Sequence, residues 1–403
     1  MYDVVVVGAR CAGAPTAMLF ARRGYRVLLV DRVTLPSDTL STLYVQQPGV
    51  ARLARWGVLD AVRASGCPPL RHVVYQLGDV RVEGCSQGVD GFRQAYAPRR
   101  YVLDGILATA AVAAGAELRP GHELVGLLAD GDRVTGVRLR GPGGGEVAEH
   151  ARLVVGADGM RSRVARLVGA GTLVADPRLT CAYYTVWKGP RTAFEMYEGP
   201  TGWVSAVPTN DGAVLVAAYH PQSRFDEVRR DARSAYLENV RCNAPALWDQ
   251  VRDAEQVERL FGTGDQQNFF RQAHGDGWVL VGDAGHHKDS LTARGITDAL
   301  MQAELLVERV GDHLDDPAAV AVALAAFAAD RDARLTENYR ATLMVASAEA
   351  RDKRVALLRT VASSSEWTQR YFDAVAGVLP LAELYTPDLL AAMAAPAGAQ
   401  VGP

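Results

Sequence analysis

The stretch Val4-Val5-Val6-Val7-Gly8-Ala9-Arg10-Cys11-Ala12-Gly13 decides the fold. Its four consecutive valines are typical of a strand that is buried on both faces. After the glycine turn, helical periodicity covers residues 14–23, and a second apolar run covers residues 26–30 and ends at Asp31. This order of strand, helix and strand predicts a β-α-β unit, and therefore a parallel sheet.

The glycine turn has the residue pattern of a dinucleotide-binding loop. Gly8 permits the tight turn, and Gly13 lets the helix approach the sheet, so that the free N–H groups of the helix face a diphosphate. At the end of the second strand, Asp31 is placed to accept hydrogen bonds from the ribose hydroxyls of an adenosine. Arg10 replaces the usual middle glycine, and its guanidinium can reach phosphate oxygens itself.

Two more motifs follow apolar runs later in the chain. One is Asp158-Gly159-Met160-Arg161-Ser162, and the other is Val281-Gly282-Asp283-Ala284-Gly285-His286-His287, closed by Arg294-Gly295-Ile296. A buried strand brings Asp283 to the carboxyl edge of the sheet, where it can bond a ribityl hydroxyl. The turn at Gly295 aims the N–H groups of the next helix at an isoalloxazine ring, whose reduced form carries negative charge.

The three motifs have the order and spacing of the FAD-dependent group A monooxygenases, the para-hydroxybenzoate hydroxylase-like family, and the chain resembles this family over residues 1–345. The segments Arg100-Tyr101-Val102-Leu103-Asp104 and 202–208 are similar to the same family's pattern. The resemblance implies FAD as cofactor and NAD(P)H as a transient co-substrate. The cofactor-binding candidates are then Gly8, Arg10, Ala12, Gly13, Asp31, Arg32, Arg100, Asp158, Gly282, Asp283, Gly295 and Ile296.

The family resemblance implies a monooxygenase that inserts one oxygen atom of O₂ into a small aromatic or polyketide-like molecule in secondary metabolism. Two alternatives keep the fold: a flavin-dependent C=C reductase resembling geranylgeranyl reductases, and a flavin-bearing non-redox cyclase. A halogenase is disfavoured, because residues 202–208 hold only one tryptophan of a W-x-W-x-I-P element.

The predicted fold class is α/β: a Rossmann-like FAD-binding domain, with a parallel sheet of the glutathione reductase type, is interleaved with a strand-rich substrate domain and followed by C-terminal helices. We assign residues 1–75, 98–178 and 266–345 to the FAD-binding domain. Residues 76–97 and 179–265 are assigned to the substrate-binding domain, and residues 346–403 to a helical tail.

The substrate candidates come from alternation along the strand that begins near Leu179. Alternation places Cys181, Tyr183, Thr185 and Trp187 on one face, which either lines a pocket or packs against helices. The pocket candidates are Tyr183, Trp187, Met196, Trp203 and His220. No catalytic residue is assigned; His286 and His287 are candidates, because they follow Asp283 and can donate protons to the ring region.

Composition limits the partners. The chain has 403 residues with 43 Lys and Arg against 46 Asp and Glu, a net charge of −3, which gives no basic surface for nucleic acid. The apolar run over residues 318–329 is too short to span a membrane. Five scattered cysteines without a C-x-x-C pair indicate a reducing compartment. We therefore expect a cytoplasmic enzyme with no bound metal, no membrane contact and a small-molecule substrate; the oligomeric state stays open.

Overall fold

The computed structural model describes residues 1–347 and 351–394. Its first layer is a mostly parallel sheet centred on the predicted strand-helix-strand unit, in which Val4 lies opposite both Val27 and Leu153. The order across the sheet is β17 (His274–Gly275), β18 (Trp278–Leu280), β8 (Glu146–Gly156), β1 (Tyr2–Val7), β2 (Val27–Asp31) and β5 (Glu117–Pro120). The predicted α/β fold with a parallel nucleotide-binding sheet is confirmed.

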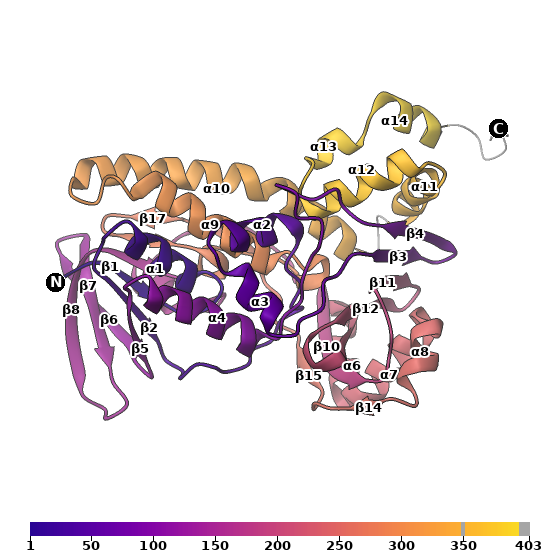
Figure 1. Cartoon of the computed structure of the whole chain (residues 1–403), viewed down its shortest axis with the longest axis horizontal. Helices are drawn as coiled ribbons and strands as arrows, with labels where there is room; N and C mark the ends of the chain where they lie inside the picture. The colour runs from indigo at the N-terminus through magenta and orange to yellow at the C-terminus, as the bar shows by residue number, and fades with distance from the viewer. Residues whose placement is uncertain (348–350, 395–403) are drawn as a thin grey trace.

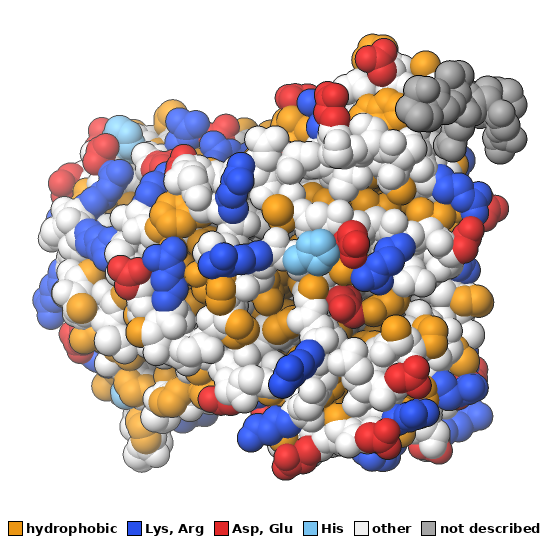
Figure 2. All heavy atoms as spheres, turned by 45° about the vertical axis from the view of Figure 1, so that its right-hand side comes forward, with side chains coloured by type: hydrophobic (Ala, Val, Ile, Leu, Met, Phe, Trp, Pro, Cys, Tyr) orange, Lys and Arg blue, Asp and Glu red, His pale blue; other side chains and the backbone are white. Residues whose placement is uncertain are grey.

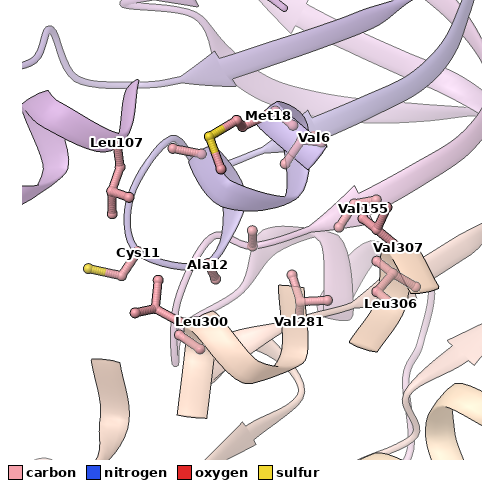
Figure 3. Packing of buried hydrophobic residues seen from close by; sticks show 14 of the residues in the cluster. Val6, Cys11, Ala12, Met18, Leu107, Val155, Val281, Leu300, Leu306 and Val307 are labelled. Atoms are coloured by element: carbon pink, nitrogen blue, oxygen red, sulfur yellow. The ribbon is translucent and has the colours of Figure 1, made fainter. Parts of the chain in front are cut away.

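Three helices cover one face of this sheet: α1 (Gly13–Arg22), α4 (Arg100–Ala113) and α9 (Gly295–Val310). In Figure 3, Met18 of α1, Val6 and Val155 of the sheet and Leu306 of α9 gather in one apolar core. This core fixes the start of α1 and the start of α9 against the same sheet edge, where the glycine motifs lie.

An antiparallel meander covers the other face. β6 (Glu123–Asp130) pairs with β7 (Arg133–Arg140), which pairs with the long strand β8. The meander forms the left end of the molecule in Figure 1. Its side chains pack on Val5 and Val7 of β1 in a second core, so both faces of β1 are buried, as a run of four valines predicts.

The second unit is a mostly antiparallel sheet. One of its faces is covered by the helices α6 (Phe225–Val228), α7 (Ala232–Asn243) and α8 (Pro245–Val251) (Figure 1). Across the sheet the order is β14 (Glu255–Gln256), β10 (Thr180–Lys188), β13 (Ala213–Pro221), β12 (Gly202–Pro208), β11 (Phe194–Gly199), β3 (Val73–Leu77) and β4 (Val80–Gly84), and β15 (Phe261–Thr263) also pairs with β10.

The chain enters this second sheet twice. It leaves the first sheet before β3, returns with α4, leaves again at β10 and returns at β17. β3 begins at Val73, so the second sheet takes up the chain slightly before the expected boundary at residue 76. A third, small sheet consists of β9 (Thr172–Asp176), β16 (Asn268–Arg271) and β19 (His286–His287).

The C-terminal third is helical. α10 (Pro317–Ala346) runs along α9, and α11 (Arg351–Ala362), α12 (Ser365–Ala376), α13 (Leu381–Leu384) and α14 (Pro387–Ala394) follow it. α11 and α12 pack against β4, while α13 packs on α12 and α14 on α11 (Figure 1). Part of the expected tail, residues 348–350 and 395–403, lies outside the described residues. Among the helices that the structure describes, none is both long and apolar enough to cross a membrane.

Charged side chains are mixed on the surface. Figure 2 shows Lys and Arg interspersed with Asp and Glu over the face that includes the C-terminal helices, without a field of one sign. This mixing agrees with the near-zero net charge of the sequence.

Candidate cofactor and substrate site

The glycine loop between β1 and α1 is closely packed. Gly8 has a φ of +103°, and a Cβ there would lie 2.4 Å from the carbonyl oxygen of Ala157. A Cβ on Gly13 would lie 1.7 Å from the carbonyl oxygen of Gly8. Only glycine fits at either position, so the start of α1 is drawn against the end of β1, as a dinucleotide-binding loop requires.

The first and third motifs meet behind this loop. Gly282 has a φ of +60°, and a Cβ there would lie 2.7 Å from Cβ of Ala12. The N–H of Gly282 donates to Oε1 of Gln302 in α9 at 3.0 Å. Figure 3 shows Ala12 beside Val281, which opens the third motif, and Leu300, which follows its second part in α9. Motifs separated by 270 residues in the chain are thus brought together by direct packing.

Two helix N-termini at this edge carry no side-chain cap. Neither Ala12, before α1, nor Arg294, before α9, bonds an N–H group of its helix with its side chain. By contrast, Ser162, Asp316 and Ser364 cap α5 (Arg163–Leu167), α10 and α12. In α1 the N–H of Ala14 donates to the carbonyl oxygen of Arg10 at 2.9 Å, and Pro15 has no N–H, so this helix offers the phosphates chiefly its positive dipole end. The uncapped start of α9 remains available for the ring edge of a flavin dinucleotide.

The carboxylate of Asp31 lies beside the glycine loop. Its Oδ2 accepts from the N–H of Ala9 at 2.8 Å, and its Oδ1 accepts from the N–H of Val33 at 3.0 Å. Asp31 is buried, whereas the neighbouring Arg32 is exposed. The two hydrogen bonds fix the carboxylate at the end of β2, the position from which such a group meets the adenosine ribose.

A buried charge cluster joins the glycine loop to α4. Asp104, which is fully buried, accepts from Arg10 at 2.9 Å, from Arg100 at 3.1 Å and from the thiol of Cys11 at 3.2 Å. The guanidinium of Arg10 also donates to Oγ of Ser37 at 2.7 Å. Arg10 and Arg100 thus lie together beside the glycine loop. The structure adds that Asp104 holds both.

Asp283 stands at the open side of this cluster. It is exposed, and no hydrogen bond engages its carboxylate within the described residues, so the group is free to bind a ligand. Burial alone lowers the pKa of Arg100, but the nearby carboxylates of Asp104 and Asp283 outweigh burial and raise it. Arg100 therefore stays charged between the loop and Asp283.

Hydrogen bonds and a buried ion pair hold the loop before α9 in place. Nη1 of Arg294 donates to Oε1 of Gln46 at 3.0 Å and to the carbonyl oxygen of Val375 at 2.8 Å. Lys288 pairs with Asp298 of α9, and both side chains are buried. Burial lowers the pKa of Arg294. These contacts hold Gly295, which is exposed, and Ile296, which is buried, at the start of α9.

In the second motif, the carboxylate of Asp158 binds the start of helix α5. Oδ1 of Asp158 accepts from the hydroxyl of Ser162 at 2.5 Å, and Oδ2 accepts from the N–H groups of Arg163 and Val164 at 2.6 and 3.1 Å. Both oxygens of Asp158 are therefore engaged at the start of α5. A cofactor contact of this side chain stays a prediction.

The two histidine candidates contact the small sheet and α10. The ring of His286 lies 4.3 Å from that of Phe270 and 5.7 Å from that of Tyr339. Burial holds the pKa of His286 well below its ordinary value. Nδ1 of His287 lies within hydrogen-bond distance of the carbonyl oxygen of Gln267, and its ring stacks on Phe269. The contacts of both rings are structural, and a proton-donor role stays a prediction.

The substrate candidates divide between two faces of the second sheet, which corrects the expectation that they share one pocket. Tyr183, Trp187 and His220 pack against α6–α8; Nε1 of Trp187 donates to the hydroxyl of Tyr236 at 2.9 Å, and His220 lies 3.2 Å from Nδ2 of Asn239. Both faces of β10 are apolar and buried, so alternation alone did not show which one meets the helices.

Trp203 and Met196 lie on the opposite face, called here the inner face, whose side chains are those of Ala182, Tyr184, Val186, Phe194, Met196, Glu198, Trp203, Ser205, Val207, Leu215, Ala217 and Tyr219. Leu291 and Ala293 of the loop before α9 belong to the same apolar cluster. The hydroxyl of Tyr219 lies 3.1 Å from Oγ of Ser290. The inner face therefore packs against the loop where the flavin ring is expected.

Sequence reasoning missed four residues of this region: Tyr44, Glu198, Tyr219 and Arg354. Tyr44 stacks on Phe194 with ring centroids 4.1 Å apart, and Glu198 pairs with Arg354 of α11. Alternation along β13 signals Tyr219 as an inner-face residue. Nothing local signals Tyr44, which lies in an irregular segment, or the pairing of residues 198 and 354.

These features define an FAD-dependent oxidoreductase: two uncapped helix starts, a glycine loop that no Cβ fits, and a free carboxylate at Asp283. Residues 1–342 match the family model described as FAD binding domain, and the chain belongs to this family. The match confirms the predicted resemblance to the FAD-dependent group A monooxygenases.

Known relatives carry out different reactions. The chain is 28% identical over 315 residues to a digeranylgeranylglycerophospholipid reductase from Methanosarcina mazei, covering 76% of this chain and 74% of the relative. The structure of this chain is similar to that of the flavin-dependent brominase Bmp2, with a TM-score of 0.83, 16% identity and 93% of each chain covered. It is also similar to PqsL, a probable FAD-dependent monooxygenase from Pseudomonas aeruginosa, with a TM-score of 0.71, 19% identity and coverage of 93% and 99%. The two structural matches bear on the fold alone.

Proposed function

We propose that the protein is an FAD-dependent monooxygenase that is reduced by NAD(P)H and inserts one oxygen atom of O₂ into a small, mostly apolar molecule of secondary metabolism. When bound, FAD supplies the hydride acceptor and, once reduced, the activation of O₂. In this proposal Gly8, Gly13 and Asp31 hold the ADP half, Asp283 holds the ribityl chain, and the first turn of α9 faces the ring.

The proposal of a small substrate rests on an ion pair that closes one end of the inner face. Glu198 pairs with Arg354, and both side chains are buried, with exposed fractions of 2% and 8%. The hydroxyl of Tyr75 donates to Glu198 at 2.9 Å. This ion pair ties α11 across the inner face, so an elongated lipid chain would have to displace a buried charge pair, at a cost of several kcal/mol.

The inner face also supports oxygen transfer. Its aromatic and aliphatic side chains pack on the loop before α9, and the buried charges of that region, Lys288, Arg294 and Asp298, lie within ion-pair distance of one another. Exclusion of water protects a reactive oxygen donor from side reactions. We therefore place the substrate on the inner face, next to residues 290–296.

A polar cavity supports docking of NAD(P)H near the second motif. It has a volume of about 610 Å³, and Arg178, Asp265, Phe269 and Arg271 are among its lining residues. Nη1 of Arg271 donates to the carbonyl oxygen of Met160 at 3.1 Å, and its guanidinium lies 4.0 Å from the ring centre of Phe269. A cation over an aromatic ring suits a nucleotide phosphate beside a stacked base.

A flavin-dependent C=C reductase is the second candidate, and the sequence similarity to the reductase from Methanosarcina mazei favours it. The two reactions differ in the product. The purified holoenzyme is incubated with NADH or NADPH under isotope-labelled O₂, with 2-acetylnaphthalene or with geranylgeranyl diphosphate. A product with one labelled oxygen atom supports the monooxygenase. A product with two added hydrogen atoms and no label overturns it in favour of the reductase, and isomerisation without use of NAD(P)H supports a non-redox cyclase.

A further inference from the structure

The indole of Trp203 is buried with an unused hydrogen-bond donor. Only 4% of Trp203 is exposed, and its Nε1 has no hydrogen-bond acceptor among the described residues. A buried tryptophan usually finds a partner for this N–H, because an unpaired donor costs about 1–3 kcal/mol. Trp187 on the opposite face follows that rule, since its Nε1 donates to Tyr236.

The position of Trp203 connects this donor to the expected ring site. Trp203 lies opposite Tyr219 in the β12–β13 pair, and the hydroxyl of Tyr219 lies 3.1 Å from Oγ of Ser290. Residues directly opposite on one face of an antiparallel pair have Cβ atoms about 4.5–5.5 Å apart. Trp203 therefore belongs to the same apolar cluster of the inner face as Leu291 and Ala293 of the loop before α9.

The surroundings are aromatic and keep some accessible surface. Tyr44 stacks on Phe194 in the same apolar cluster as Trp203, and the Tyr44 hydroxyl has no hydrogen-bond partner among the described residues. Met196 and Tyr184, also on the inner face, are only partly buried. A flat ring system can therefore meet apolar side chains here.

The charges nearby cancel. Glu198 lies opposite Trp203 in the β11–β12 pair and forms its ion pair with Arg354. Nε of Arg354 likewise has no acceptor within the described chain. Because Glu198 already balances the charge of Arg354, a ligand anion here would leave one negative charge in excess. The two free donors thus suit a neutral acceptor oxygen better than a carboxylate.

We propose that Trp203 is a substrate-binding residue, and that the substrate is a flat aromatic molecule whose neutral oxygen, a ketone or hydroxyl group, accepts the indole N–H. The proposal rests on the proposed function, because it places the substrate on the inner face, and it names the substrate class for that site. The oxygen acceptor orients the ring system in front of the loop before α9, and the Tyr44–Phe194 pair supplies the apolar wall.

The test compares matched ligands and matched variants of the holoenzyme by titration calorimetry. The probes are 2-acetylnaphthalene, 2-ethylnaphthalene, which lacks the oxygen, and 2-naphthoate, which is an anion. The variant Trp203→Phe removes the donor but keeps a ring, and Trp187→Phe is the control on the helix-covered face. We expect Trp203→Phe to weaken binding of 2-acetylnaphthalene about tenfold, as for the loss of one hydrogen bond, and to leave 2-ethylnaphthalene unchanged.

Several results would overturn the proposal: no binding of 2-acetylnaphthalene by the parent, equal binding of the acetyl and ethyl compounds, or an unchanged ratio of the two in Trp203→Phe. An equal loss in Trp187→Phe would also overturn it, because it would show a general effect on the sheet. Tighter binding of 2-naphthoate than of 2-acetylnaphthalene would overturn the proposal that the acceptor oxygen is neutral. Binding is measured without NAD(P)H, so a failure of oxygen transfer shows separately in the product analysis.

Discussion

The guanidinium of Arg10 lies 2.9 Å from the carboxylate of Asp104, and the side chain of Asp104 is fully buried. Arg100 contacts the same carboxylate from one turn earlier in α4, at 3.1 Å. One buried anion therefore holds two cations beside the loop that is expected to receive the diphosphate of FAD. Diphosphate binding would add negative charge to a site where cations already outnumber this anion.

Asp104→Asn should destabilise the protein more without FAD than with it. The variant keeps the shape but removes the charge that balances two arginines, and a broken buried ion pair costs about 3–5 kcal/mol. Bound FAD would restore part of that balance through its phosphates. Denaturant unfolding of the apoprotein and the holoenzyme measures both losses. An equal loss in the two forms would show that Arg10 and Arg100 do not face the diphosphate.

Asp283→Ala should lose most of its FAD without a matching loss of stability in the apoprotein. The side chain is exposed and no described residue bonds its carboxylate, so only a ligand contact disappears. Asp158→Ala is the contrasting variant: it removes an anchor of α5 and should cost about 1–2 kcal/mol of stability. Flavin absorbance per protein and thermal unfolding check both. An Asp283→Ala protein with full flavin content would contradict the assignment.

The local parts of the site were predictable from the sequence. Gly8, Gly13 and Asp31 lie within one strand-helix-strand unit, where spacing fixes geometry. The partners of these residues were not predictable, because they come from distant segments: Ala157 beside Gly8, Asp104 beneath Arg10, and Gln302 on Gly282. Such contacts depend on how the helices pack, which periodicity does not encode.

The inner face shows the same limit. Alternation along β10 separated Tyr183 and Trp187 from Tyr184 correctly, but both sets are apolar, so the sequence did not indicate which set meets α6–α8. The closure by α11 depends on Glu198 and Arg354, which are 156 residues apart and carry no pattern that links them.

Gly8→Ala and Gly24→Ala should differ strongly, although both glycines have positive φ. At Gly24 nothing lies within 4 Å of an added Cβ, so only backbone strain of about 1 kcal/mol is expected. At Gly8 the Cβ would also lie 2.4 Å from the carbonyl oxygen of Ala157. The loop must move, and both stability and FAD affinity should fall. Similar stability losses in chemical unfolding would argue against the close approach of β1 to residue 157.

The pH dependence of stability should depend on His220. Burial, with a contribution from the charge of Arg224, lowers the pKa of His220 from 6.5 to about 4. Above pH 6.5 the ring is neutral in both the folded and the unfolded state, so its contribution is complete. As the pH falls from 6.5 to 4, the unfolded chain takes up a proton that the folded state refuses, and stability falls by about 3 kcal/mol.

His220→Gln keeps a group that can accept a hydrogen bond from Asn239 but does not titrate. It should therefore reduce the loss of unfolding free energy between pH 6.5 and 4, whereas the exposed His313→Gln should not. Urea unfolding at several pH values measures the slopes. The slope should not vanish in His220→Gln, because His286 is also held neutral by burial. An unchanged slope would mean that His220 is protonated in the fold, and that α7 leaves room for its charge.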